Sequence, residues 1–337
     1  MRKAIALTFA LLATVAATLM AQAQNFPSRT ITLIVPYPAG GPTDTIARIL
    51  AERMGTALGQ TMIVENIGGA GGSMGVGRVA HTTPDGYMLI IGHTQTHVFN
   101  AGILKLDYDV VKDFAPISLL ADTPIWIVVR KSLPVDDVKG LIAHLKSQNG
   151  KATMGTVGIG SPSEFAARIF MRETGTSFQL VPYRGAAPLI QDMLGDHIDF
   201  AFGQAAGYIT NVEAGHFKAL AVLQPKRWWA APNVPTLDEL GFKDLDVTFW
   251  HGLWAPKGTP PDVIAKLNAA VRVSLADATV QDRFKKVGQE IWPIAYQTPR
   301  GADSAANGAA RQMATRGPGI WHQGRVKPRG EPHERTR

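Results

Sequence analysis

Short runs of β-branched and apolar residues alternate along this chain with longer segments whose apolar residues recur at the spacing of one helix face. Ile31 to Val35 is the first such run, and a Pro/Gly-rich loop follows it from Pro36 to Pro42. Apolar residues from Ile46 to Met54 then repeat with a helical period. Nearly continuous apolar strands that alternate with helices are typical of a parallel sheet covered on both faces. The pattern therefore predicts an α/β fold.

The same alternation continues through the middle of the chain. We predict further strands over residues 61–65, 87–91, 152–156, 179–182 and 198–202, and helices over residues 138–147, 163–174 and 187–194.

Two stretches have the character of crossings between lobes. Ile117 to Val129 is long and apolar and is interrupted by Pro124, and Val247 to Ala255 is rich in aromatic residues. We therefore predict a discontinuous first lobe, residues 24–120 with 252–297, and an inserted second lobe, residues 125–247. Two crossings make a hinge, and clefts between domains are favoured ligand sites.

The two ends of the chain differ from this body. Arg2 and Lys3 precede an uncharged apolar run that ends in Ala21-Gln22-Ala23, so residues 1–23 are predicted to be a signal peptide that is cleaved after Ala23 and directs export to the periplasm. A membrane anchor is the alternative, but the apolar run is short for a span. Residues 298–337 are dominated by Gly, Pro, Arg and Ala, and we predict a disordered tail there.

Composition and charge exclude several classes of function. The chain has no cysteine, which excludes disulfides, zinc–thiolate sites and thiol nucleophiles. The net charge of +7 comes from the ends, because residues 1–23 carry two basic groups, residues 298–337 carry eight basic and three acidic groups, and 24 of each sign remain between them. A body of balanced charge has no basic surplus for a phosphate backbone, so no nucleic-acid partner is expected.

The loop after the first predicted strand offers backbone donors to a ligand. Pro36-Tyr37-Pro38-Ala39-Gly40-Gly41-Pro42-Thr43-Asp44 contains two glycines that allow close approach, and Pro42 suits the first turn of a helix. Free N–H groups at a helix start receive a carboxylate or a phosphate. From this loop alone, a plain tight turn is an equally good interpretation.

A second loop, from Thr156 to Glu164, has the same character. Ser161 followed by Glu164 is a capping-box pattern, and Pro162 stands at the first helical position, which leaves the glycine amides and Ser163 for a ligand. Each helix start contributes about 0.3–1 kcal/mol to anion binding. Two such starts that face one cleft would suit a ligand with two carboxylates.

Other chemical patterns in the chain are incomplete. Gly75 to Ala80 matches G-x-G-x-x-A, but no Asp or Glu occurs from Met88 to Leu106, where the dinucleotide fingerprint needs one. His93 and His97 are four residues apart, but Thr94 stands where a zincin has Glu. We therefore expect no cofactor, no metal and no catalytic residue.

Short motifs follow one another in a characteristic order over residues 26–296. They are Phe26-Pro27-Ser28-Arg29, the Pro38 to Asp44 loop, Val64-Glu65-Asn66 with Gly69-Ala70-Gly71-Gly72, Pro84-Asp85-Gly86-Tyr87, Asp113-Phe114-Ala115-Pro116, Val181-Pro182-Tyr183-Arg184-Gly185, Ala219-Leu220-Ala221-Val222 and Pro256-Lys257-Gly258-Thr259-Pro260. In this order they resemble the substrate-binding proteins of tripartite tricarboxylate transporters, the Bug or TctC family.

The resemblance implies a two-lobed periplasmic solute-binding protein of the Venus flytrap, type II-like architecture, monomeric and without enzymatic activity. Such a protein captures a small carboxylate (a di- or tricarboxylate, an aromatic acid or an acidic amino acid) and delivers it to membrane permease subunits. The ligand contacts implied for this chain are Ala39, Gly40, Gly41, Thr43, Asp44, Thr94, Thr96, Gly160, Ser161, Ser163 and Gln204.

One departure from the family pattern and one alternative function bear on this expectation. Relatives often carry Asp where this chain has Gly203, and we expect its absence to shift the ligand preference toward simple carboxylates. A periplasmic sensor that docks on a sensor kinase is the alternative function, because the same fold serves both roles. An α/β enzyme is disfavoured by the missing motifs.

Overall fold

The computed structural model describes residues 26–158, 160–243, 245, 247 and 249–316. The predicted signal peptide and residues 317–337 of the predicted tail lie outside the described residues. Within them, none of the helices combines the length and apolar character needed to cross a bilayer.

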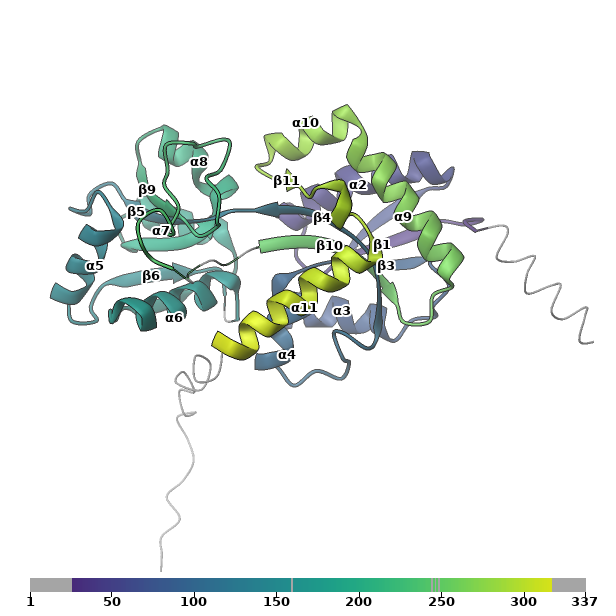
Figure 1. Cartoon of the computed structure of the whole chain (residues 1–337), viewed down its shortest axis with the longest axis horizontal. Helices are drawn as coiled ribbons and strands as arrows, with labels where there is room; N and C mark the ends of the chain where they lie inside the picture. Colours follow the sequence, from purple (N-terminus) through teal and green to yellow (C-terminus); the bar gives the residue numbers. More distant parts are fainter. Residues whose placement is uncertain (1–25, 159, 244, 246, 248, 317–337) are drawn as a thin grey trace, which may run out of the picture.

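Two α/β lobes lie side by side, each built on its own sheet (Figure 1). The sheet of the first lobe has the strand order β11-β4-β10-β3-β1-β2, and that of the second lobe has the order β7-β6-β8-β5-β9. The strands of the first sheet are β1 (Ile31–Val35), β2 (Met62–Asn66), β3 (Met88–His93), β4 (Phe114–Thr123), β10 (Phe249–Pro256) and β11 (Glu290–Ile291). Those of the second are β5 (Ile125–Arg130), β6 (Thr153–Thr156), β7 (Gln179–Pro182), β8 (Phe200–Gln204) and β9 (Phe217–Val222).

Both sheets are mixed, whereas the apolar runs predicted a parallel sheet. The β1–β2, β1–β3, β6–β7 and β6–β8 pairs are parallel, as predicted. Each sheet also contains antiparallel pairs: β10 is antiparallel to β3 and β4, β11 is antiparallel to β4, and β5 is antiparallel to β8 and β9. A strand that is buried on both faces is apolar whether it runs parallel or antiparallel to its neighbours, so the apolar pattern could not distinguish parallel from antiparallel pairing.

The lobes are joined at two neighbouring points. Pro124 separates β4 in one sheet from β5 in the other, and because proline has no N–H it interrupts the ladder there. The chain returns before β10, whose first residue, Phe249, lies opposite Thr123, the last residue of β4. The chain thus passes between the sheets at the two predicted crossings, while the lobe boundaries given above stay a prediction.

Helices cover both faces of each sheet (Figure 1). In the first lobe α2, α9 and α10 pack on one face and α3 and α11 on the other, and in the second lobe α5 and α6 pack opposite α7 and α8. The helices are α2 (Pro42–Leu58), α3 (Ser73–Ala80), α4 (Asn100–Ile103), α5 (Val138–Ser147), α6 (Pro162–Thr174), α7 (Ala186–Leu194), α8 (Ala205–Glu213), α9 (Pro261–Ala276), α10 (Ala278–Lys286) and α11 (Pro299–Arg316), with short helices η1 (Ala70–Gly72), η2 (Gln95–Phe99) and η3 (Ile294–Tyr296).

Helix α11 corrects the prediction of a disordered tail for residues 299–316. Its Ala302 is fully buried, and Ala305, Ala306, Ala309 and Ala310 pack against the core that includes strands of the first sheet. Alanine has the highest helix propensity and its small side chain lets a helix approach a sheet closely. The sequence argument counted only bulky apolar residues and so missed this helix.

Candidate ligand-binding site

The loop between β1 and α2 ends in a helix start with free donors. Gly40 has a φ of +85°, and Gly41 is the N-cap residue of α2. The first intrahelical hydrogen bond runs from the Thr45 N–H to the Gly41 carbonyl. Helix geometry therefore leaves the N–H groups of Gly41, Thr43 and Asp44 without an intrahelical acceptor. These three donors at the positive end of the helix dipole can receive an anionic oxygen.

The Asp44 side chain holds this loop in place. Its carboxylate accepts hydrogen bonds from the Gly40 N–H, the Arg48 Nε and the Asn66 Nδ2, each at 2.9 Å. Burial by itself would raise the pKa of Asp44, but the hydrogen bonds from Arg48, Gly40 and Asn66 outweigh it and hold that pKa below its usual value. Asp44 is thus ionised and holds the loop in shape, and both of its carboxylate oxygens already accept hydrogen bonds.

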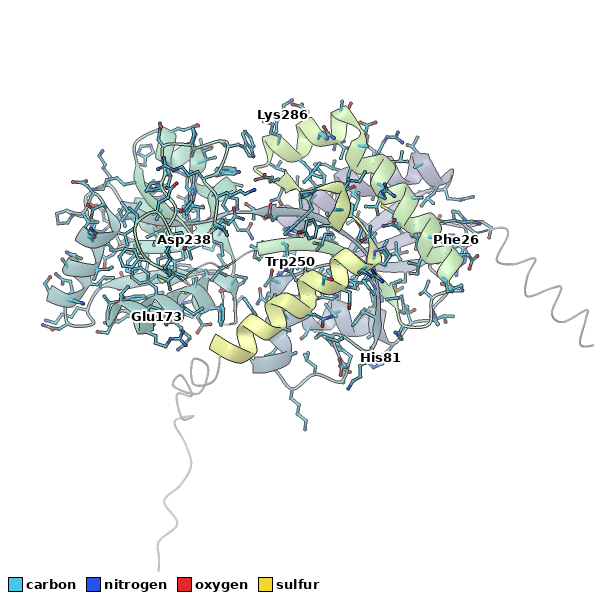
Figure 2. All side chains as sticks on the ribbon, in the orientation of Figure 1. Phe26, His81, Glu173, Asp238, Trp250 and Lys286 are labelled. Carbon is cyan, nitrogen blue, oxygen red and sulfur yellow. The ribbon has the colours of Figure 1, made fainter. Side chains whose placement is uncertain are left out.

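The threonines implied as ligand contacts are also engaged within the protein. The Thr43 Oγ1 lies 3.1 Å from the His251 Nε2, and the Thr94 Oγ1 accepts a hydrogen bond from the Trp250 N–H at 3.2 Å. Figure 2 labels Trp250 on β10, at the junction of the lobes. Thr43 and Thr94 are buried, and both bonds tie them to β10.

Thr96 is fully buried within its own turn. Its hydroxyl accepts from the His93 N–H at 3.0 Å and donates to the His93 carbonyl at 3.1 Å. Because the Oγ1 also lies 3.0 Å from the His97 Nδ1, it shapes the end of β3 from inside. It does not present a free hydroxyl.

Three buried histidines lie beneath these loops and carry no charge at neutral pH. Burial lowers the pKa values of His97 and His251 to about 3. Burial, together with the neighbouring His251 and His97, also holds the pKa of His93 well below its usual value. The His93 ring stacks on Tyr37 with a centroid distance of 4.8 Å, and His97 stacks on Trp254 at 4.0 Å. The three histidines near the α2 start are therefore neutral, and the charge of Arg48 is paired with Asp44, so the first-turn N–H groups supply the unpaired positive potential.

The loop between β6 and α6 forms the predicted capping box, except that the Glu164 carboxylate bonds the N–H of Gly160 and not that of the N-cap residue Ser161. Ser161 is the N-cap residue, and its Oγ accepts from the Glu164 N–H at 3.3 Å. The Glu164 carboxylate reaches back to the Gly160 N–H at 2.7 Å and is paired with Arg168 at 2.6 Å. The Ser163 Oγ lies 2.8 Å from the Ser161 Oγ and accepts from the Val157 N–H. With Pro162 lacking an N–H, the Ser163 N–H is the first-turn donor left over.

Contacts between the lobes bring the end of β3 and the start of α6 together. The rings of Phe99 in η2 and Phe165 in α6 are 4.7 Å apart. A Cβ atom on Gly160 would lie 2.0 Å from the Ile103 Cδ1, so glycine permits this close approach. The turn that holds Thr94 and Thr96 and the loop that holds Gly160, Ser161 and Ser163 thus lie on neighbouring surfaces of the two lobes.

The remaining candidates, Ala39, Gly40 and Gln204, make fewer side-chain contacts. Ala39 and Gly40 are exposed at the tip of the first loop. Gln204 ends β8 and precedes α8, and its side chain makes no hydrogen bond to the residues that the structure describes. No hydrogen bond or ion pair within the described part of the chain joins Gln204 to the other candidates, so its part in the site stays a prediction.

Helix α8 supplies a third helix start that sequence reasoning missed. Its Ala205 N–H donates to the Pro124 carbonyl at 2.8 Å, which ties the helix to the crossing between the lobes. The N–H groups of Ala206 and Gly207 have no intrahelical acceptor. Gln204 at the N-cap is not one of the residues that favour that position, so no capping residue marks this helix start in the sequence.

The Gly203 departure is explained by packing. A Cβ atom at this position would lie 2.1 Å from the Tyr208 ring and 2.9 Å from its hydroxyl. An aspartate at 203 therefore requires Tyr208 to move, so the two positions are coupled and the expected shift of ligand preference cannot be assigned to Gly203 alone.

The nucleotide-like and metal-like patterns have structural explanations. Gly75 and Gly77 lie inside α3, and a Cβ on Gly75 would be 2.7 Å from the Ile67 carbonyl oxygen, so the glycines serve close packing. His93 and His97 belong to the buried cluster described above. Within the described ranges, no group of three or more histidine, aspartate or glutamate side chains is placed to hold a metal ion.

Comparison with known proteins gives a consistent assignment. Residues 46–307 match the family described as the tripartite tricarboxylate transporter family receptor. A UPF0065 protein in the TAR-I ttuE-ttuC' intergenic region of Agrobacterium vitis is 39% identical over 298 residues, which cover 88% of this chain and 86% of that protein.

Two solved structures from Rhodopseudomonas palustris share the fold. MatC with bound malate is 33% identical with a TM-score of 0.79, and the match covers 86% of this chain and 99% of that one. A second protein of that organism, solved with adipate, is 29% identical with a TM-score of 0.79, over 87% of this chain and 99% of that one. This chain therefore belongs to the tripartite tricarboxylate transporter receptor family of two-lobed periplasmic solute-binding proteins.

Proposed function

We propose that this protein captures a small dicarboxylate between its lobes and holds it mainly through backbone N–H groups. One carboxylate is bound by the first turn of α2, at Gly41 and Thr43, and the other by the Ser163 N–H at the start of α6. Ala39, Gly40 and Gln204 border the ligand, while Asp44, Thr94, Thr96, Gly160 and Ser161 hold the loops in shape.

The observation that supports this most directly is the way polar groups are distributed around the two helix starts. Nearly every polar side chain there is engaged within the protein, including Asp44, Thr43 and Ser161. The first-turn N–H groups are left as donors, and three buried histidines near them are neutral. Donors of this kind select negative oxygen atoms and make few demands on the rest of the ligand. The malate and adipate bound by the two structural relatives are dicarboxylates of different length, which agrees with such a site.

The proposal includes export and delivery. We propose that the chain is cleaved after Ala23, acts in the periplasm as a monomer and passes its ligand to membrane permease subunits of the tripartite type. Mass spectrometry of the secreted protein should find Gln24 as the first residue, and vesicles that contain the permease should take up the ligand only when this protein is added.

Ligand capture is tested by thermal unfolding of the mature protein with malate, adipate and tricarboxylates, and with the matched diamides as neutral controls. A ligand at about 100 times its dissociation constant stabilises the folded state by about 2.7 kcal/mol. We expect stabilisation by at least one carboxylate and none by its diamide. A cooperative unfolding transition that no di- or tricarboxylate shifts would refute the proposal.

A further inference from the structure

A cavity lies at the edge of the first sheet, outside the candidate site. It has a volume of about 580 Å³ and is lined by α9, α10, β11 and η3 together with Trp229. None of the eleven candidate ligand residues lines it. Its volume falls in the range of small-molecule sites, about 300–1,000 Å³.

The aromatic walls of this cavity come from both lobes. Trp229 follows β9, packs edge-on against the buried Trp228 of the second-lobe core with a centroid distance of 5.6 Å, and remains 44% exposed. Trp292 follows β11 in the first lobe. The Lys285 Nζ, on α10, is 4.7 Å from the centroid of the Trp229 ring. The cavity therefore exists only where the two lobes meet in this arrangement.

Two residues that line the cavity carry buried polar atoms that lack a partner. Gln289 is only 2% exposed, and neither its Oε1 nor its Nε2 has a hydrogen-bond partner in the described part of the chain. The same holds for the Trp292 Nε1. The Gln289 backbone is fixed by a hydrogen bond from its N–H to the Phe284 carbonyl at 2.9 Å. Because a buried polar atom without a partner costs free energy, these groups favour an occupant that supplies one.

The charges around the cavity favour an anion. Arg272 and Lys285 line it, and neither forms an ion pair with the residues described here, whereas Glu290 is the one carboxylate among its lining residues. The neighbouring Lys286, which Figure 2 labels on α10, is by contrast paired with Asp282 at 2.7 Å and does not line the cavity. Guanidinium and ammonium groups bind carboxylates through charge-assisted hydrogen bonds, and indole faces bind flat apolar groups.

We propose that this cavity is a second ligand site, which takes a monocarboxylate with a flat aromatic body. The ring packs between Trp229 and Trp292, and the carboxylate is held by Arg272 and Lys285 above the Gln289 amide. A ligand in this place touches both lobes. The site is separate from the dicarboxylate site proposed above and does not depend on it.

The test uses phenylacetate as the probe and the mature protein labelled with 5-fluorotryptophan. The fluorine resonances are assigned by Trp229→Phe, Trp292→Phe and Trp254→Phe variants, and phenylacetate is titrated while the spectra are recorded. We expect the Trp229 and Trp292 resonances to move saturably, the Trp254 resonance to stay in place, and phenylacetamide to bind at least tenfold more weakly.

Matched variants locate the binding. Arg272→Ala with Lys285→Ala should weaken phenylacetate binding at least tenfold, and Gln289→Leu should weaken it about fivefold, which are ordinary losses for a charge-assisted and a neutral hydrogen bond. Lys286→Ala, which removes a cation one residue away, should bind as the unaltered protein does. No saturable shift at Trp229 and Trp292, equal binding by the double variant, or a shift confined to Trp254 would each overturn the proposal.

Discussion

The His251 Nε2 lies 3.1 Å from the Thr43 hydroxyl, so the strand by which the chain returns from the second lobe is bonded to the first turn of α2. Thr43 contributes one of the free N–H groups of that turn, and His251 is the third residue of β10. The two residues are fully or almost fully buried. The shape of the proposed carboxylate site is thereby set by the strand that also forms the hinge.

Replacement of Thr43 by valine should weaken both folding and ligand binding. Thr43→Val keeps the branched shape but leaves the His251 Nε2 without a partner, and an unpaired buried polar atom costs about 1–3 kcal/mol. Urea unfolding measures the first effect and calorimetric titration with the dicarboxylate the second. Thr56→Val, at the other end of α2, removes an exposed hydroxyl bonded to the Glu52 carbonyl and should leave affinity unchanged. Wild-type affinity in Thr43→Val would contradict the structural role given to this bond.

Two glycines allow the effect of the first loop on ligand affinity to be measured separately from its effect on stability. Gly40 and Gly59 have φ values of +85° and +66°, and no atom lies within 4 Å of a Cβ built on either. Alanine at each position should cost about 1–2 kcal/mol, because only the left-handed backbone is penalised. Gly40→Ala should also lower dicarboxylate affinity, while Gly59→Ala, at the far end of α2, should not. If both variants bind alike, the Gly40 loop is not part of the site.

The capping box of α6 should couple helix stability to binding. Ser161→Ala removes the N-cap acceptor and should cost about 1 kcal/mol. Asp137→Ala removes the N-cap of α5, whose carboxylate accepts from the Gly140 N–H, and should cost about the same. Only Ser161→Ala should raise the dissociation constant of the dicarboxylate, as measured by calorimetry. An equal loss of affinity in both variants would indicate a general effect of stability instead.

The half-buried Asp122 should make folding less favourable as the pH rises toward 7. Burial, and next the charge of Glu290 on the neighbouring strand, raise the pKa of Asp122 to about 7, and the Gln224 Nε2 donates to it at 3.4 Å. A free aspartate has a pKa of about 3.9, so between about pH 4 and 7 the folded protein binds more protons than the unfolded chain. The contribution of Asp122 to the free energy of unfolding therefore falls as the pH rises through this window and is constant above it.

Asp122→Asn removes this dependence. We expect the variant to gain about 2–4 kcal/mol over the original protein above pH 7 and little at pH 4, since one pKa unit corresponds to about 1.4 kcal/mol. Urea unfolding of both proteins from pH 4 to 9 gives the difference, in which the contributions of the histidines cancel. A difference that does not change with pH would show that Asp122 titrates normally.

Removal of α11 should destabilise the first lobe. A chain that ends at Thr298 lacks the buried Ala302 and the alanines packed near it, and loses apolar burial worth about 25 cal/mol per Å². Its melting temperature should fall by several degrees. A chain that ends at Arg316 retains the whole helix and should melt as the full-length protein does, whereas equal melting of both truncated chains would show that the helix contributes nothing.

Local chemistry explains which elements the sequence could predict. The predicted ranges of β1, α5 and β7 coincide with those in the structure, because each has an apolar run with clear ends, such as the Asp137 cap of α5. The capping box at Ser161 and Glu164 was readable for the same reason.

The features that the sequence did not reveal depend on distant partners. Thr43 and His251 are 208 residues apart, so no local pattern links them. The direction of β10 and β5 follows from the crossings and leaves no trace in their apolar runs. The start of α8 is held by the Pro124 carbonyl instead of a capping side chain. In each case the information lies in tertiary contacts and not in residue type.

The pairing of Phe249 with Thr123 has a consequence for movement. Two neighbouring crossing strands that are hydrogen-bonded to one another act as a single hinge. Sliding or twisting one lobe against the other would break the hydrogen bonds between the two strands, whereas a rotation that opens or closes the lobes only bends the strands. Opening and closing should then follow one angular coordinate. Since the chain has no cysteine, two introduced thiols, one at the exposed Lys139 and one at the exposed Asp262, can carry spin labels whose single distance reports the whole motion.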